Sequence, residues 1–220
     1  MKGMEKQQER IKKLLITGWP IIAGQVGLVL MGVADTVMVG KIGHIPLAAA
    51  GLAVSIFFLI SIFGIGLISI TSALVTAERA KGNELQLSGL LRDSVIIGQL
   101  IGLVLFILMV IVIRFLPQLG QESEVAAQAG PFLFLLALSV FPMYIYMSGK
   151  SLCDGYYYTL FPMIVTIGAL LLNIFLNWIL IYGNWGCPPL GLLGAGWATL
   201  ISRIVMAVAI FIFIFKSPGI

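Results

Sequence analysis

The chain has 220 residues, of which 60% are hydrophobic and only 10% are charged. A soluble domain of this size carries about 25% charged residues to cover its surface, so this composition excludes a soluble globular protein and makes lipid the expected solvent. The net charge of +4 would suit a nucleic-acid partner, but the charges gather between apolar segments, and we expect no nucleic acid.

Six apolar segments are long enough to cross a bilayer, which takes about 20 residues of helix. They predict an all-α fold, a polytopic membrane bundle of six transmembrane helices that forms a single lobe over residues 1–220. Asp35 lies in the first segment and Arg203 in the last. The expected spans are about 14–39, 47–77, 94–116, 125–149, 158–182 and 192–215.

The basic residues between the spans predict the orientation. If the amino terminus is cytoplasmic, the outer segments hold only Lys41 and Arg114. Cytoplasmic loops collect Lys and Arg, so we expect a multi-pass protein of the inner (plasma) membrane with both termini in the cytoplasm. The basic residues on the cytoplasmic side are Lys2, Lys6, Arg10, Lys12, Lys13, Arg79, Lys81, Arg92, Lys150 and Lys216.

The fourth span carries the clearest local signals. Pro131 and Pro142 are expected to kink it. We expect 150–155 to be a tight connection to the next span. Tyr144 and Tyr146 would then lie near the inner interface, where an aromatic belt is the favoured explanation.

The sequence offers no catalytic group pair, and no cofactor is expected. The single histidine, His44, lies in an expected loop. Cys153 and Cys187 fall at opposite membrane faces on this topology, which excludes a disulfide between them. We therefore predict that the protein is not an enzyme.

Asp35 is the most informative residue, because an acid inside a span costs a few kcal/mol to insert. Such an acid usually faces a bundle interior or a water-filled cavity, where it can bind a cation or carry a proton. The alternative is an acid near the outer helix end that reaches toward the headgroups. We favour function, because aspartate is short and reaches poorly.

Asn173 and Asn177 are four residues apart and share one face of the fifth span. Their amides could bind an adjacent helix. Together with Asp35 they could form a hard-oxygen site suited to Na⁺, or a network that tunes a proton-carrying acid. Thr199 could add a hydroxyl, although threonine in a membrane helix more often bonds its own backbone.

Gln25 and Arg203 are two further polar residues within spans. Gln25 is expected to be a buried amide. Arg203 could pair with an acid, line a polar cavity, or mark a helix boundary. We take both residues as possible cavity lining.

Three segments carry a family resemblance: MGVADTVMVG at 31–40 followed by LAAAGL at 47–52, NIFLNWILIYG at 173–183, and GLLGAGWATLISR at 191–203. The chain resembles the amino-terminal half of a MATE (multidrug and toxic compound extrusion) transporter. The resemblance implies an antiporter that exports small organic cations in exchange for Na⁺ or H⁺. It also implies a coupling-ion site at Asp35, Asn173, Asn177 and Thr199.

The resemblance has departures. Some members have an acid where this chain has Asn177, which leaves the coupling ion open, and Lys150 stands where arginine is frequent. Members have twelve spans in two lobes, so the resemblance makes this chain one lobe of a two-lobed transporter. We expect it to need a carboxy-terminal lobe or a second copy for transport.

Two other functions compete with the antiporter. A lipid-linked oligosaccharide flippase of the related superfamily would need a basic cavity, and the spans offer it only Arg203. A non-transporting membrane partner subunit is the second alternative, and the length of the chain is its only support.

Overall fold

The computed structural model describes residues 2–81, 84–118 and 120–216, with side chains from residue 15 onward except at 82–88 and 119. The described chain is helical and contains no strand, which confirms the all-α prediction. Two 3₁₀ turns, Leu116–Gln118 and Asn184–Gly186, lie between helices. The seven α-helices are α1 (Lys2–Gly40), α2 (His44–Ala80), α3 (Glu84–Phe115), α4 (Ser123–Leu138), α5 (Val140–Gly155), α6 (Leu160–Leu180) and α7 (Leu192–Lys216).

The seven described helices make six segments that are long and apolar enough to cross a membrane. The number is six because α4 and α5 together form the fourth span. The two are separated only at Ser139. Pro142 follows three residues later and has no N–H to bond the carbonyl of Leu138, which weakens the helix at this point. Pro131 lies inside α4, which continues past it to Leu138.

Some helix ends differ from the expectation. Residues 150–155 were expected to be a connection, but they form the last turns of α5. Lys150 and Asp154 are paired within this helix at 2.6 Å, so its two charged residues offset each other. On the other side of the bundle α3 begins at Glu84, well before the expected start at 94.

The tyrosines of α5 also differ from the expectation of an aromatic belt. Tyr144 is fully buried and its hydroxyl donates to the Ser61 carbonyl oxygen on α2, at 3.1 Å. Tyr146 is 1% exposed and its hydroxyl lies 2.6 Å from Thr166 Oγ1 on α6. A buried hydroxyl needs a partner, and these two find partners on neighbouring helices. Both tyrosines therefore hold helices together rather than marking a membrane surface.

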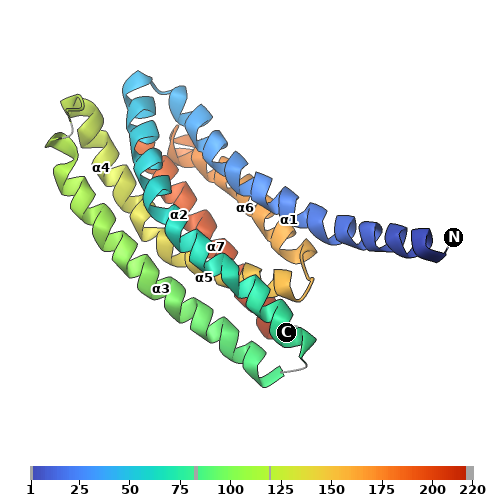
Figure 1. Ribbon diagram of the computed structural model, residues 1–220. Coiled ribbons are helices and arrows are strands. Elements are labelled where there is room, and N and C mark those ends of the chain that lie inside the picture. Colours follow the sequence, from blue (N-terminus) through green and yellow to red (C-terminus); the bar gives the residue numbers. More distant parts are fainter. Residues whose placement is uncertain (1, 82–83, 119, 217–220) are drawn as a thin grey trace.

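The helices pack in two groups joined by α7. On one side α1 packs along α6, and α6 along α7; on the other, α2 packs against α3, α4 and α5. Figure 1 shows α1 and α6 side by side, with α3 at the opposite edge. Because α7 also packs against α4 and α5, it lies between the groups. A change in the position of α7 would therefore alter the packing of both groups of helices.

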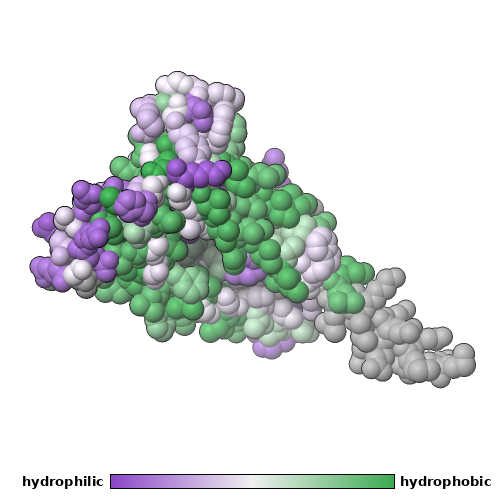
Figure 2. Space-filling view, turned by 90° about the horizontal axis from the view of Figure 1, so that it is seen from above, coloured by the Kyte–Doolittle hydropathy of each residue, from purple (hydrophilic) through white to green (hydrophobic). Residues whose placement is uncertain are grey.

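The outer surface is apolar. Figure 2 shows hydrophobic side chains over much of the face seen from above. Large apolar side chains such as Phe58, Phe63 and Leu171 are 60%, 72% and 62% exposed. Such a surface suits lipid rather than water.

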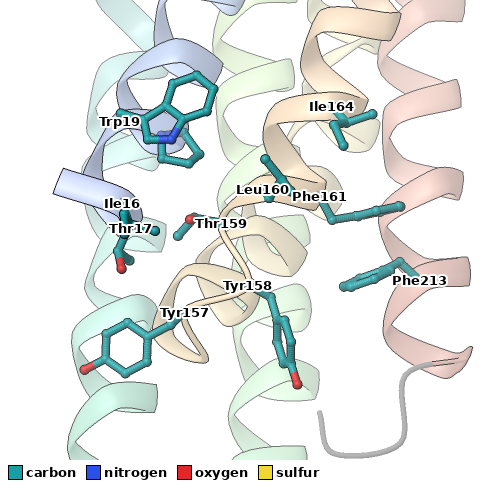
Figure 3. A pocket seen from close by; sticks show the side chains of 11 residues that line it. Ile16, Thr17, Trp19, Tyr157, Tyr158, Thr159, Leu160, Phe161, Ile164 and Phe213 are labelled. Carbon is teal, nitrogen blue, oxygen red and sulfur yellow. The ribbon is translucent and has the colours of Figure 1, made fainter. Parts of the chain in front are cut away.

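A pocket of about 550 Å³ lies where α6 begins and α7 ends (Figure 3). Its walls include Trp19 of α1, and Phe161 and Phe213, whose rings stack at 3.8 Å. Trp19 and Asp35 are 16 positions apart on α1, or roughly 24 Å at about 1.5 Å per residue. The pocket is therefore separate from the acid of the first span.

Candidate cation site

Asp35 is buried inside the bundle. The residue is only 8% exposed and faces α6 and α7 through its carboxylate. This placement differs from the alternative considered for it, an acid that reaches toward the headgroups.

Both carboxylate oxygens of Asp35 accept hydrogen bonds from other helices. Asn177 Nδ2 on α6 donates to Oδ1 at 2.6 Å. Thr199 Oγ1 on α7 donates to Oδ2 at 2.8 Å. Hydrogen bonds to an ionised group are short and strong, so the carboxylate joins α1, α6 and α7 at one point.

The two asparagines extend this network along α6. Asn177 Nδ2 also donates to Asn173 Oδ1 at 3.2 Å, and Asn173 Nδ2 lies 3.5 Å from Thr199 Oγ1. Both asparagines are fully buried and Thr199 is 3% exposed. The structure thus brings together all four residues predicted for the ion site.

One oxygen of the network is unused. Asn177 Oδ1 is buried and has no hydrogen-bond partner among the described residues. Leaving a buried acceptor unpaired costs about 1–3 kcal/mol. An amide presents a donor on one side and an acceptor on the other, so rotation of this side chain would exchange what it offers to Asp35.

The α6–α7 connection places Thr199 within reach of the carboxylate. Gly183 adopts the left-handed conformation (φ 74°) and turns the chain at the end of α6. Leu190 N then donates to the Leu180 carbonyl oxygen at 2.9 Å, which ties the start of α7 to α6. At Gly194 a Cβ atom would lie 2.6 Å from that same carbonyl group, so only glycine allows this approach.

Tyr182 fixes α1 against the end of α6. Its hydroxyl donates to the Met38 carbonyl oxygen at 2.9 Å, one turn beyond Asp35. Sequence reasoning did not assign Tyr182 to the site. No spacing rule could have found it, because its partner is a backbone carbonyl 144 positions away.

Gln25 and Arg203 take no part in the hydrogen bonds of the network. Gln25 was expected to be buried, but its side chain is exposed on α1. Arg203 lies one turn beyond Thr199 on α7 and is partly buried. Its Nη1 donates to Ser139 Oγ at 2.5 Å. Arg203 therefore points to the α4–α5 break, and Gln25 lies outside the network.

The ligand types limit which ions this site could hold. Among the described residues no group of three His, Cys, Asp or Glu side chains could hold a metal ion. The oxygens at Asp35 come from one carboxylate, amides and a hydroxyl, which are hard ligands. Such a set fits Na⁺ or a proton better than a transition metal.

The chain matches known sequences over most of its length. The sequence model of the family described as MatE matches residues 20–179. A probable multidrug resistance protein NorM from Photorhabdus laumondii is 32% identical over 203 residues, covering 92% of this chain and 45% of that protein. Another probable NorM, from Halalkalibacterium halodurans, is 31% identical over 229 residues, covering 99% of this chain and 48% of that protein. The chain spans about half the length of the curated relatives it matches.

Solved structures agree on the fold. A multidrug resistance MATE family transporter of the MOP superfamily, in an outward-facing conformation, superposes with a TM-score of 0.84 at 24% identity, covering 93% of this chain and 45% of that one. The Vibrio cholerae MATE transporter VcmN in its bent form gives 0.78 at 26% identity, covering 93% and 46%. The predicted resemblance is thus confirmed, and because the family consists of transporters, so is the prediction that this is no enzyme. The chain belongs to the MatE family of membrane transporters.

Proposed function

We propose that the chain forms the amino-terminal lobe of an ion-coupled exporter of small organic cations, and that Asp35, Asn173, Asn177 and Thr199 take up the coupling Na⁺ or H⁺. The observation that carries this proposal is the buried Asp35 carboxylate, which is hydrogen-bonded to two other helices. The names of the relatives, multidrug resistance proteins, support the substrate class.

The unused oxygen of Asn177 suggests how the site changes state. With Asp35 ionised, the Asn177 amide donates to it. When a proton or Na⁺ arrives, rotation of this amide turns Oδ1 toward Asp35. The oxygen then accepts the proton of the carboxyl group or binds the cation, and it is no longer an unpaired acceptor.

Occupancy of the site would change helix packing. The carboxylate is the point at which α1 meets α6 and α7. An ion that binds one packing of these helices more tightly than another shifts the population toward it. An organic cation that prefers the other packing is then coupled to the ion. Transport itself needs a second six-helix lobe or a second copy, since one lobe has nothing to rock against.

The distribution of basic residues supports both termini in the cytoplasm and a plasma (inner) membrane location. On this orientation Asp35 lies toward the outer end of α1, and the aromatic pocket of Figure 3 lies toward the cytoplasm.

Infrared difference spectroscopy of the chain in lipid nanodiscs tests the ion site directly. Acid should produce the C=O stretch of a protonated carboxyl group, or Na⁺ should shift the carboxylate bands. Acid also protonates the other Asp and Glu side chains of the chain, so the informative signal is the part of the response that Asp35→Asn removes and that Asp154→Asn, the matched control, keeps. A response of Asp35→Asn identical to that of the wild type contradicts the proposal.

The need for a second lobe has its own test. The chain alone in proteoliposomes should not transport an organic cation dye in exchange for Na⁺ or H⁺ when a gradient of that ion in the opposite direction is imposed. Export by a chain shown to be monomeric would contradict this part of the proposal.

A further inference from the structure

Arg203 is a charged group inside the last span. A charge at that depth is costly and is retained only with partners. The residue follows Thr199 by four positions, so the two side chains share one face of α7. Thr199 binds Asp35, whereas Arg203 binds the other group of helices.

The hydrogen-bond partner of Arg203 is the residue that separates α4 from α5. Ser139 is fully buried. Its Oγ accepts from Arg203 Nη1 at 2.5 Å and donates to the Leu136 carbonyl oxygen at 2.6 Å. The hydroxyl is thereby satisfied as acceptor and donor at once, and the guanidinium is fastened to the α4–α5 joint, residues 136–142.

Phe57 on α2 is a second partner. The guanidinium carbon of Arg203 lies 4.8 Å from the centre of the Phe57 ring, which is 8% exposed. A cation over an aromatic face at this distance contributes favourable electrostatic energy. Arg203 thus connects α7 with α2 as well as with the α4–α5 joint.

Arg203 also interacts electrostatically with Asp35. The two groups have opposite charges, and Thr199, which donates to Asp35 Oδ2 at 2.8 Å, lies one helical turn from Arg203 on α7, although Arg203 and Asp35 share no hydrogen bond in the described structure. The helix that carries Arg203 packs against α6 on one side and against α4 and α5 on the other. One residue of α7 is therefore placed to sense the charge of the acid and to act on a different part of the bundle.

We propose that Arg203 is a positioning residue that links the charge of Asp35 to the packing of the α4–α5 joint. With Asp35 ionised, the two charges balance and Arg203 stays on Ser139 and Phe57. When Asp35 is neutralised, Arg203 becomes a partly buried cation inside the bundle without its counter-charge, which is unfavourable. Water then reaches the guanidinium and the joint loosens. The inference rests on the proposed function only in that the coupling ion is what neutralises Asp35.

Amide hydrogen exchange of the chain in nanodiscs tests this link. Asp35→Asn neutralises the acid whichever ion is used, and it should speed exchange at residues 136–142 by about tenfold, equivalent to about 1.4 kcal/mol. In an Arg203→Met background, Asp35→Asn should change amide exchange at residues 136–142 by less than about twofold. Arg203→Lys, which keeps the charge, should preserve most of the effect. Arg114→Met, which removes an exposed arginine of α3, is the matched control and should leave it unchanged.

The outcomes separate the two proposals. If Asp35→Asn acts equally with and without Arg203, or leaves residues 136–142 unaffected, the link is overturned. If Arg203→Met does not fold, Arg203→Lys is compared with the wild type instead. A larger effect of Asp35→Asn on amide exchange at residues 136–142 in the Arg203→Lys background than in the wild type overturns the link. Adding Na⁺ or acid to the wild type should reproduce the Asp35→Asn pattern. If only that last arm fails, the proposed ion site is wrong and the link stands.

Discussion

Two carboxylates inside this bundle, one buried and one partly buried, are held in different ways. Asp35 accepts hydrogen bonds from residues 142 and 164 positions away, on two other helices. Asp154 binds Lys150 on its own helix, four positions away, at 2.6 Å. Both side chains of that pair are 11% exposed. The hydrogen bonds of Asp35 depend on the packing of three helices, whereas the counter-charge of Asp154 lies on its own helix.

The difference indicates which acid can respond to an ion. The Lys150–Asp154 pair is neutral as a unit, and helix movement does not separate its members. Breaking it leaves a buried lysine. Asp35 has only neutral hydrogen-bond donors in direct contact and shares no hydrogen bond with Arg203, so a cation can still bind the carboxylate directly. Four substitutions test how differently the two acids are held.

Asp154→Asn should have the largest effect on stability. It leaves Lys150 buried without a counter-charge, which lowers the free energy of unfolding by about 3–5 kcal/mol. Denaturation in mixed micelles measures this value, and the infrared ion signal should be unchanged. Replacing both members, as Lys150→Met with Asp154→Leu, should restore stability to within about 1 kcal/mol. A stable single variant would show that the pair is not needed.

Gly194→Ala should have the next largest effect on stability. The added Cβ would lie 2.6 Å from the Leu180 carbonyl group, so α7 must move away from α6. We expect a loss of about 1–3 kcal/mol in unfolding free energy, together with a weaker ion signal, because Thr199 moves with α7. Gly32→Ala on α1 meets nothing within 4 Å and serves as the control. An unchanged ion signal in a destabilised Gly194→Ala variant would contradict the dependence of the ion site on the packing of α7 against α6.

Asp35→Asn should show the opposite balance to Asp154→Asn. Its unfolding free energy should fall by only about 1.5 kcal/mol, since the amide replaces the carboxylate in shape and keeps part of the hydrogen bonding. The part of the infrared response to Na⁺ or acid that belongs to Asp35 should be absent. A loss of stability as large as that of Asp154→Asn would place both acids in the same structural role.

Tyr182→Phe should have the smallest effect. It removes the hydrogen bond to the Met38 carbonyl oxygen and should cost about 0.5–1 kcal/mol. The ion signal should persist but need a higher ion concentration, because α1 is held less firmly beside Asp35. Tyr157→Phe, at a residue that is 60% exposed, is the control. Equal effects from both tyrosines would exclude a specific role for Tyr182.

Much of the fold follows from hydropathy alone. Apolar segments of sufficient length must form helices in lipid, because every backbone group has to be bonded within its own segment. Helix spacing likewise places Asn173 and Asn177 on one face. Hydropathy did not predict that 150–155 continue α5. A buried pair within one helix looks the same in the sequence as a charged connection.

Composition and local periodicity are enough to predict the helical class, the six apolar segments and the polar residues within them. The contacts of Asp35 with Asn177 and Thr199, of Tyr182 with α1, and of Arg203 with Ser139 become visible only once the helices are packed. These contacts join positions far apart in the chain, and the contact of Thr199 in particular needs the close approach of α7 to α6 at Gly194. No local pattern encodes such distances, since they arise only when whole helices pack against one another.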